Sequence, residues 1–395
     1  MKIRLGIIFG GETVEHEISI ISAIQAMKNI DTDKYEIVPI YIAKDRTWYT
    51  GKMLMNLDVY KDFEDLKRYA HRVTLCKKDD RFFLVNTTGI FRRNVEEIDI
   101  AFPIVHGNNV EDGSLQGYLD TIGIPYVGPK VLGAALGQDK VVMKQVFASE
   151  GLPIVKYEWF YDMEYFTDAE GIRKKIKKMN FPVIVKPAGL GSSIGITKVE
   201  EAEDLNEAIL EAIRYDYKII VEEAVENLME VNCSVCGNYE YQKVSVIEEV
   251  MGVDEILSYT DKYISGNKSG GTSSKGMAAT NRVIPARISD KLTKEVESIS
   301  KKVFTTLNLS GVCRIDYLID KDTDKVYINE PNTIPGSLAF YLWKPIGVTY
   351  KQLLDDMITM SIKEFKNKTK KVYTFDTNVL SNFKEGNGSK ASKFK

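Results

Sequence analysis

Residues 185–199 read VKPAGLGSSIGITKV, a Gly- and Ser-rich loop entered by an apolar run that carries Lys186. Glycine lets a backbone approach an anion closely, and free N–H groups and hydroxyls bind phosphate oxygens. The lysine precedes the glycines and no Gly-Lys-Ser/Thr end follows, so the loop is not a Walker A motif. The pattern predicts a phosphate-binding loop that follows a strand, with a flexible hairpin turn as the alternative.

Two strand-like segments downstream carry carboxylates at alternate positions. Arg314-Ile315-Asp316 and Glu330-Pro331-Asn332 each place two polar side chains on one face of a strand, because side chains alternate with period 2. If the two strands pair, their oxygens form one cluster of the hard ligands that suit Mg²⁺ carried on a nucleotide. A solvated sheet face with cross-strand ion pairs is the alternative.

The N-terminal third contains two further candidate ligand sites. Gly10-Gly11 ends the first apolar run, and Glu15 and Glu17 then open a helical pattern. A Gly-x-Gly-x-x-Gly fingerprint is absent, and acidic groups at a helix start suit an ammonium ligand better than a pyrophosphate, although they also compensate a helix dipole. His106 follows another strand-like run at the usual ligand edge of an open α/β sheet, where a structural histidine is the alternative.

The order of the elements predicts an α/β and α+β protein. Residues 1–130 alternate strand and helix patterns, which predicts a parallel sheet, with a hairpin-like insertion at about 44–95. A single helix is expected over residues 134–150, because Gly151 and Pro153 follow it. We expect a second region at 131–230, a third at 231–372 and a tail at 373–395. A Gly-, Ser- and Lys-rich segment at 265–280 is either a linker or a mobile lid.

Composition excludes several classes of function. The 395 residues hold 53 Lys and Arg against 56 Asp and Glu, a net charge of −3, which argues against a nucleic-acid binder. No apolar run approaches the ~20 residues of a membrane span, and the N-terminus lacks signal-peptide features, so we expect a cytoplasmic protein. Cys233 and Cys236 do not form a zinc site, since residues i and i+3 of a strand face opposite sides.

Five segments in this order resemble the D-alanine–D-alanine ligase family of ATP-grasp enzymes: FGGETVEHEISIISA, HGNNVEDGSLQGYLD, VKPAGLGSSIGITKV, CRIDYLID and INEPNTIPGS. The resemblance covers about residues 2–360. It implies an ATP-grasp fold, with an N-terminal Rossmann-like parallel-sheet domain followed by two lobes that hold ATP. It further implies ligation of two D-alanine molecules for peptidoglycan synthesis.

The resemblance assigns a role to each site residue, grouped here by ligand. The residues implied in ATP binding are Lys140, Lys186, Ser193, Glu222, Glu223, Ala224, Val225, Glu230 and Lys262. Those implied as metal ligands, for Mg²⁺ as a pair of ions or for Mn²⁺, are Asp316, Glu330 and Asn332. Those implied in catalysis are Glu15, Ser192, Tyr263, Arg314 and Gly336. Those implied in binding the D-amino acids are His106, Ser337 and Tyr341.

The same resemblance implies a homodimer and a loop, at about 262–284, that closes over ATP. The segment SLAFYLWKP after Gly336 departs from the family pattern, in which a serine binds the carboxylate of the second substrate. Tyr341 occupies that place by ungapped count, with Lys344 beyond it. The second substrate therefore stays open between D-alanine, D-serine, D-lactate and another amine.

Two functions of other classes remain as alternatives. A non-catalytic nucleotide-binding regulator is disfavoured, because Arg314 and all three candidate metal ligands are present. A nicotinamide-dependent dehydrogenase is disfavoured by the missing glycine fingerprint.

Overall fold

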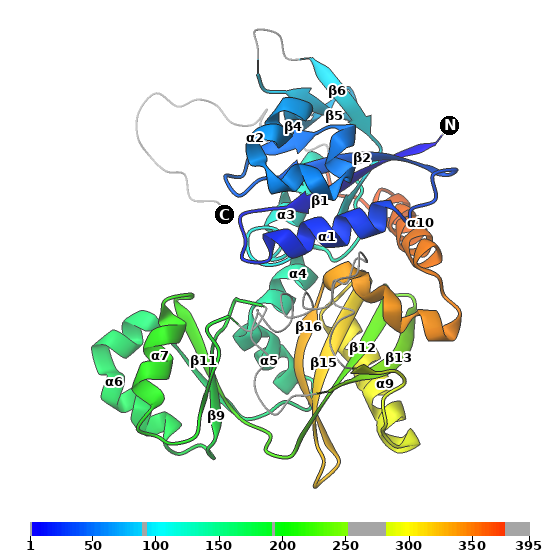
Figure 1. The fold of residues 1–395 in the computed structure, drawn as a ribbon. Helices are drawn as coiled ribbons and strands as arrows, with labels where there is room; N and C mark the ends of the chain where they lie inside the picture. Colours follow the sequence, from blue (N-terminus) through cyan, green and yellow to red (C-terminus); the bar gives the residue numbers. More distant parts are fainter. Residues whose placement is uncertain (1, 89–92, 192–193, 252–281, 376–395) are drawn as a thin grey trace, which may run out of the picture.

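The computed structural model describes residues 2–88, 93–191, 194–251 and 282–375, and it contains three sheets (Figure 1). The first sheet has the strand order β6-β5-β4-β3-β2-β1-β7. Its strands are β1 (Ile3–Gly10), β2 (Tyr35–Ile42), β3 (Trp48–Thr50), β4 (His71–Lys78), β5 (Arg81–Asn86), β6 (Asn94–Ile98) and β7 (Ile100–Pro103). The parallel pairing expected for this region holds for β1 with β2 and with β7, whereas β2 to β6 pair antiparallel.

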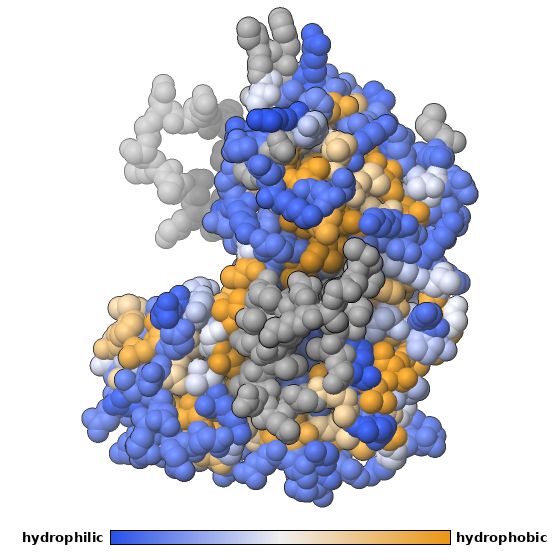
Figure 2. All heavy atoms as spheres, viewed as in Figure 1, coloured by the Kyte–Doolittle hydropathy of each residue, from blue (hydrophilic) through white to orange (hydrophobic). Residues whose placement is uncertain are grey.

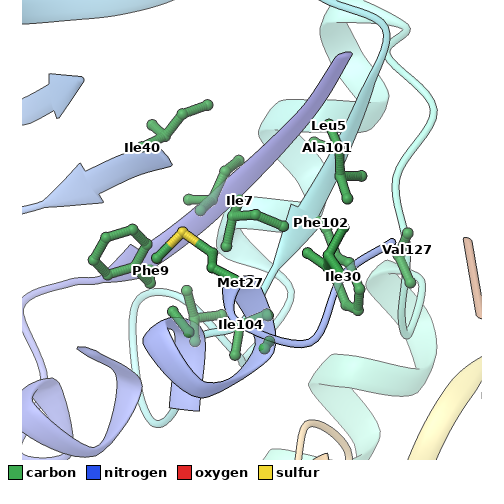
Figure 3. Close-up of a cluster of buried hydrophobic side chains, with 14 of the residues drawn as sticks. Leu5, Ile7, Phe9, Met27, Ile30, Ile40, Ala101, Phe102, Ile104 and Val127 are labelled. Carbon is green, nitrogen blue, oxygen red and sulfur yellow. The ribbon is translucent and has the colours of Figure 1, made fainter. Parts of the chain in front are cut away.

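The first sheet has a buried core between its central strands and the helices that cover them. Leu5, Ile7 and Phe9 of β1 are fully buried, and Figure 3 shows them with Met27 of α1 and Phe102 of β7. A run of apolar residues that is buried on both sides is typical of a central parallel strand. The helices of this part are α1 (His16–Met27), α2 (Phe63–Tyr69) and α3 (Ser114–Ile122), with two short 3-10 turns, η1 (Lys52–Met55) and η2 (Leu57–Lys61).

The chain returns to this core near its C-terminal end. Trp343, Leu353 and Met357 belong to the same buried cluster as β1. They come from the segment of η5 (Gly336–Leu342) and η6 (Lys344–Ile346) and from the last helix, α10 (Tyr350–Lys368). The C-terminal region therefore packs against the N-terminal sheet and helps to fix its position relative to the rest of the molecule.

The second sheet is small and antiparallel, with the order β10-β9-β11-β8. Its strands are β8 (Tyr157–Tyr161), β9 (Val183–Pro187), β10 (Thr197–Val199) and β11 (Lys218–Glu223), and α6 (Asp162–Ile176) and α7 (Leu205–Ile213) pack on it. The predicted phosphate loop thus lies between β9 and β10, which pair as neighbours. This placement presents the loop at one end of a hairpin.

The third sheet has five antiparallel strands in the order β14-β13-β12-β15-β16. They are β12 (Leu228–Gly237), β13 (Gln242–Val250), β14 (Arg282–Val283), β15 (Gly311–Asp320) and β16 (Lys325–Asn332), and α9 (Asp290–Thr306) covers one face. The second and third sheets lie side by side below the first in Figure 1, with α4 and α5 between them. Figure 2 shows hydrophilic residues over much of the outer surface of this face.

The single helix expected over residues 134–150 is wrong. The chain forms α4 (Val131–Gln138) and α5 (Lys140–Ser149), with Asp139 extended between them. The Asp139 carboxylate accepts hydrogen bonds from the N–H groups of Val141 and Val142, so it caps α5. The break places Lys140 in the first turn of a new helix.

Among the described residues, no helix combines the length and the apolar character that a membrane crossing requires.

Candidate functional site

A cavity of about 60 Å³ lies where segments of all three sheets approach one another. Its walls include seven of the residues singled out from the sequence, namely Glu15, His106, Lys140, Arg314, Glu330, Asn332 and Gly336. These residues come from positions up to 321 apart in the chain, and the fold brings them to one place. The cavity is therefore the candidate active site.

The predicted carboxylate cluster is present on β15 and β16. Asp316 lies directly opposite Glu330, and Arg314 directly opposite Asn332. The Arg314 guanidinium donates two hydrogen bonds of 2.7 Å to the Asp316 carboxylate, and Asn332 donates a third of 3.1 Å. Burial works to lower the pKa of Arg314, but the Asp316 carboxylate outweighs it and the pKa is raised. Arg314 is therefore a permanent cation in the wall of the cavity.

Lys140 joins this cluster from the helix α5. Its Nζ lies 2.9 Å from the Glu330 Oε2, and both side chains are largely buried. Burial favours the neutral amine, yet the Glu330 carboxylate outweighs it, so the pKa of Lys140 is raised. The lysine expected at the ATP phosphates thus lies beside the carboxylate expected to hold the metal.

The Gly-rich loop is tied to the start of α5 by hydrogen bonds. Lys140 donates from its backbone N–H to the Ala188 carbonyl at 3.0 Å and from its Nζ to the Leu190 carbonyl at 2.6 Å. Gln138 donates to the Gly189 carbonyl at 2.8 Å. The loop that follows β9 is therefore held against the cavity by the helix that carries Lys140.

The Glu15 carboxylate lies between two glycines of different segments. A Cβ added at Gly191 would lie 3.0 Å from the Glu15 Oε2, and one added at Gly107 would lie 3.1 Å from the same atom. Gly107 also has a φ of +84°, a conformation that disfavours any side chain. The two glycines leave room for the carboxylate at the cavity wall, where it could receive an ammonium group.

Lys186 pairs with the buried carboxylate of Glu222 at 2.8 Å. Lys144 lies on the other side of that carboxylate, 3.2 Å away and fully buried. Burial works to raise the pKa of Glu222, but the two lysines outweigh it and the pKa is lowered. Burial in turn lowers the pKa of Lys144. Sequence reasoning missed Lys144, although its position one helical turn after Lys140 puts both on one face of α5.

The other residues expected at the adenine and the ribose run from the end of β11 into β12. The Glu223 carboxylate bonds Lys156 at 3.1 Å and the Asn180 backbone at 2.9 Å. The Ala224 N–H donates to the Pro182 carbonyl, and Val225 is half-buried in the connection that follows. Glu230 is half-buried on β12, opposite Leu318 of β15. None of these residues lines the cavity described above.

His106 lies at the junction of the N-terminal sheet and η5. Its Nε2 is 3.0 Å from the Ser22 hydroxyl oxygen, which also accepts from the Ser337 N–H at 2.9 Å. Burial lowers the pKa of His106 to about 4, so the imidazole is neutral at physiological pH. The Ser337 hydroxyl donates to Gln25 of α1. The structure thus places His106 in the cavity wall and Ser337 behind it.

Glu111 lines the cavity, and sequence reasoning gave it no role. Its carboxylate accepts from the Gly107 N–H at 3.0 Å, from the Thr333 hydroxyl at 3.0 Å and from the Ile334 N–H at 2.9 Å. Burial raises its pKa to about 7, and the Glu15 carboxylate adds to the effect. The signal in the sequence is its place five residues after His106, in the motif HGNNVEDG. Glu111 fixes the chain that follows Asn332 to the N-terminal domain.

Tyr341 lies next to Arg314 but does not line the cavity itself. Its hydroxyl donates to the Glu248 carboxylate at 2.7 Å. The Arg282 guanidinium lies over its ring, 4.5 Å from the ring centroid. Lys344, by contrast, is exposed. The segment that departs from the family pattern thus forms a polar cluster of its own beside the cavity.

Four of the expected site residues, Ser192, Ser193, Lys262 and Tyr263, lie outside the described residues. Most of the segment expected to close over ATP, 262–284, also lies outside them. These assignments stay predictions.

The oxygen atoms of β15 and β16 fit a divalent ion that arrives with a nucleotide. Asp316 and Glu330 face each other across the strand pair, and Asn332 donates its amide N–H to Asp316, which leaves its carbonyl oxygen as a ligand. Within the described ranges no group of three or more His, Cys, Asp or Glu could hold a metal. Burial raises the pKa of Cys233 and Cys236 to about 12, which disfavours the thiolates that zinc requires.

Comparisons with known proteins agree along nearly the whole chain. Residues 4–129 match the family model described as D-ala D-ala ligase N-terminus, and residues 146–359 match D-ala D-ala ligase C-terminus. The D-alanine–D-alanine ligase of Thermosipho melanesiensis is 39% identical over 382 residues, 96% of this chain and 98% of that protein. That of Thermosipho africanus is 38% identical over 381 residues, with the same coverage.

Solved structures give the same result. The D-alanine–D-alanine ligase from Coxiella burnetii superposes with a TM-score of 0.78 at 27% identity, over 93% of this chain and 96% of that chain. The VanG D-Ala:D-Ser ligase from Enterococcus faecalis superposes with a TM-score of 0.75 at 29% identity, over 91% of this chain and 100% of that chain.

Proposed function

Because this chain belongs to the D-alanine–D-alanine ligase family, we propose that its cavity joins two D-alanine molecules through an acyl-phosphate intermediate, with ATP converted to ADP and phosphate. The observation that carries the proposal is the meeting of Arg314, Gly336 and Lys140 in the wall of one cavity. A carboxylate is a poor electrophile, so its oxygen must first take the terminal phosphoryl group of ATP. The product would serve peptidoglycan synthesis.

The first D-alanine would lie between Glu15 and Arg314. The Glu15 carboxylate, in its place between two glycines, receives the ammonium group, and His106 lies alongside as a neutral imidazole. Arg314 and the Gly336 N–H hold the carboxylate that is to be activated. We assign Ser192 and Tyr263 to a hydroxyl network with Glu15, and Ser337 to support of this substrate from behind the cavity wall.

Positive side chains would stabilise phosphoryl transfer. Lys140, Lys186 and Lys262 neutralise charge that develops on the transferring group, and Ser193 adds a loop hydroxyl. Residues 222–225 would line the adenine, and Glu230 would hold the ribose. Mg²⁺, when bound, screens the phosphate oxygens and orients them. Asp316, Glu330 and Asn332 would hold it, as a pair of ions or with Mn²⁺ in its place.

The amide bond would form in the second step. The neutral amine of the second substrate gives its electron pair to the acyl carbon and forms the new C–N bond. The bond from that carbon to the phosphate oxygen then breaks, and phosphate leaves with the electrons of the broken bond. One amine proton is released. Arg314 and the Gly336 N–H stabilise the oxyanion that forms between these events. A lid over residues 262–284 would exclude the water that hydrolyses acyl phosphates.

A same-mechanism ligase with another acceptor is the second candidate. The observation that favours it is Tyr341, held by Glu248 where the family pattern has a serine. D-serine, D-lactate or another amine would then replace the second D-alanine. The VanG structure, titled a D-Ala:D-Ser ligase, is one neighbour of this kind.

Three features of the whole protein are proposed on the same basis. They are a homodimer formed through the N-terminal domain, a cytoplasmic location, and a division into residues 1–130, 131–230 and 231–372 with a tail beyond. Sedimentation of the purified chain tests the first. A monomer at working concentration would contradict it.

ADP release tests the reaction. The chain is incubated with Mg²⁺ and ATP, with single D-amino acids, with pairs of them and with D-lactate, and products are identified by mass spectrometry. We expect ADP release that requires D-alanine and a product with the mass of D-alanyl-D-alanine. ADP release without any amino acid, or none at all, would contradict the proposal. A mixed product in preference to the homodipeptide would favour the second candidate.

A further inference from the structure

The junction between α4 and α5 contacts all three parts of the molecule. Figure 1 shows these two helices between the second and third sheets and below the first. A Cβ added at Gly137 would overlap with the Thr333 side chain, so the end of α4 packs closely on the chain that follows β16. Gln138, the last residue of α4, lines the cavity, and the proposed mechanism gives it no role.

The Gln138 side-chain amide joins the N-terminal domain to the second sheet. Its Nε2 donates to the Asn108 Oδ1 at 2.7 Å and to the Gly189 carbonyl at 2.8 Å. A backbone carbonyl only accepts, so the amide nitrogen must face Gly189, and its second hydrogen is left for Asn108. One planar group therefore holds two acceptors that come from distant segments of the chain.

Asn108 belongs to the segment proposed to lie beside the first D-alanine. It follows His106 and Gly107 in the chain, and a Cβ added at Gly107 would lie 3.1 Å from the Glu15 Oε2. Glu15 and His106 both line the cavity. A substrate held by these two side chains would therefore restrict the backbone from which the Asn108 side chain extends.

Gly189 belongs to the loop proposed to hold the ATP phosphates. The Asp216 carboxylate accepts from the Gly189 N–H at 2.7 Å, and the Lys140 Nζ donates to the Leu190 carbonyl at 2.6 Å. These bonds hold the loop from the side of the second sheet and of α5. The amide of Gln138 holds the same loop to the segment beside the proposed D-alanine site.

We propose that Gln138 is a positioning residue that couples the two binding sites, so that D-alanine and ATP each strengthen the binding of the other. The inference rests on the proposed function and adds a route by which its two sites communicate. D-alanine that restricts residues 106–108 also restricts the Gln138 amide, and through it the Gly189 carbonyl. Less freedom of the loop is then left to lose when ATP binds. The coupling free energy is the same whichever ligand binds first.

Binding of a non-hydrolysable ATP analogue to the full chain with Mg²⁺ tests this coupling without turnover. Titration calorimetry gives the Kd of the analogue without D-alanine and with saturating D-alanine. We expect D-alanine to lower this Kd about fivefold or more in the wild type. Gln138→Met keeps an unbranched side chain but removes both donors, and the ratio of the two Kd values should fall below about twofold.

This ratio separates the positioning role from a merely structural one. A structural defect would raise both Kd values by the same factor and leave their ratio at that of the wild type. A wild-type ratio retained in Gln138→Met would therefore overturn the inference, and so would a ratio near one in the wild type itself. Gln352→Met is the matched control, because Gln352 lies exposed on α10.

Asn108→Ala tests the other end of the same contact and leaves Gln138 in place. It should lower the ratio as Gln138→Met does, and the double variant should lower it no further, because both changes break one connection. An unchanged ratio in Asn108→Ala would overturn the route through this amide.

Asp216→Ala is the contrasting variant, since Asp216 anchors the Gly189 N–H within the second sheet. It should raise the Kd of the analogue equally with and without D-alanine. A fall of the ratio as large as that in Gln138→Met would overturn the assignment of the coupling to Gln138.

The two proposals fail in distinguishable ways. A wild-type chain that binds neither the analogue nor D-alanine would overturn the proposed function together with this inference. A wild type that forms D-alanyl-D-alanine, with an unchanged ratio in Gln138→Met, would overturn this inference alone.

Discussion

The Lys140 Nζ lies 2.9 Å from the Glu330 Oε2, so the lysine proposed for the ATP phosphates is already paired with a proposed metal ligand. Arg314 and Asp316 form the same kind of pair one strand away. Under the proposed function, the two cations would face the negative charge of the nucleotide and the two carboxylates would face its metal. In both pairs the positive charge is matched by a negative charge before any substrate binds. Four predictions test the roles of the charged residues in and around the site.

Arg314→Ala should lower kcat about a hundredfold or more, because the oxyanion loses its charged donor. The KM of ATP should change much less. Arg287→Ala is the control, since Arg287 pairs with Glu249 on β13, two strands from Arg314, and its side chain is 59% exposed. A kcat near that of wild type in Arg314→Ala would remove this residue from the reaction.

Removal of divalent ions with EDTA should abolish ADP release, and Mg²⁺ should restore it. Glu330→Gln should then raise the Mg²⁺ concentration needed for half-maximal rate about tenfold or more, because one anionic oxygen ligand is lost. Glu150→Gln is the control, because Glu150 follows the last residue of α5 and its side chain is 50% exposed. The same Mg²⁺ requirement in both variants would show that Glu330 is not a ligand.

Glu222→Gln should lower the free energy of unfolding by about 3 kcal/mol, because it leaves Lys144 and Lys186 buried without their counter-charge. Glu211→Gln breaks the exposed pair with Arg214 and should change the free energy of unfolding much less, because water screens exposed ion pairs. Urea titration measures both. Equal losses in the free energy of unfolding would show that the buried ion pairs stabilise the fold no more than the exposed pair does.

Glu111 should give the stability a distinct pH dependence. Its pKa is raised from 4.5 to about 7 in the folded chain, so the unfolded chain ionises first. Its stabilising contribution is present below pH 4.5 and is lost as the pH rises through 7. The stability of wild type relative to Glu111→Gln should fall by about 3 kcal/mol over that interval. A constant difference in urea titrations between pH 4.5 and 7.5 would contradict the shift.

The elements that were predicted well are those with a strong local pattern. The strand at 35–42 and the carboxylate strands β15 and β16 were expected from apolar runs and from alternation, and the structure has them. The helix over 134–150 was wrong, because apolar spacing continues through Asp139 while the Asp139 side chain caps a new helix. The antiparallel pairing of β2 to β6 in the first sheet was predicted only as a hairpin-like insertion, because short strands show little periodicity in sequence.

The site residues that were predicted are also those with a local pattern, and the ones that were missed depend on distant partners. Arg314 and Asp316 share a strand, and period 2 alone predicts that they point the same way. Lys144 and Glu111 were missed, because a buried lysine and a buried glutamate look like surface residues until the partners that compensate them are known. Their partners come from segments far away in the chain.

The sequence by itself determined the family, since five motifs in a fixed order are specific where each alone is weak. It also indicated which residues are candidates to bind a nucleotide and its metal. Only the tertiary structure decided that Glu15, His106, Arg314 and Gly336 line one cavity, because that depends on how three sheets pack. The structure alone also decided that the Tyr341 proton goes to Glu248, since the pairing of a hydroxyl is set by the neighbours that the fold supplies and not by its position in the chain.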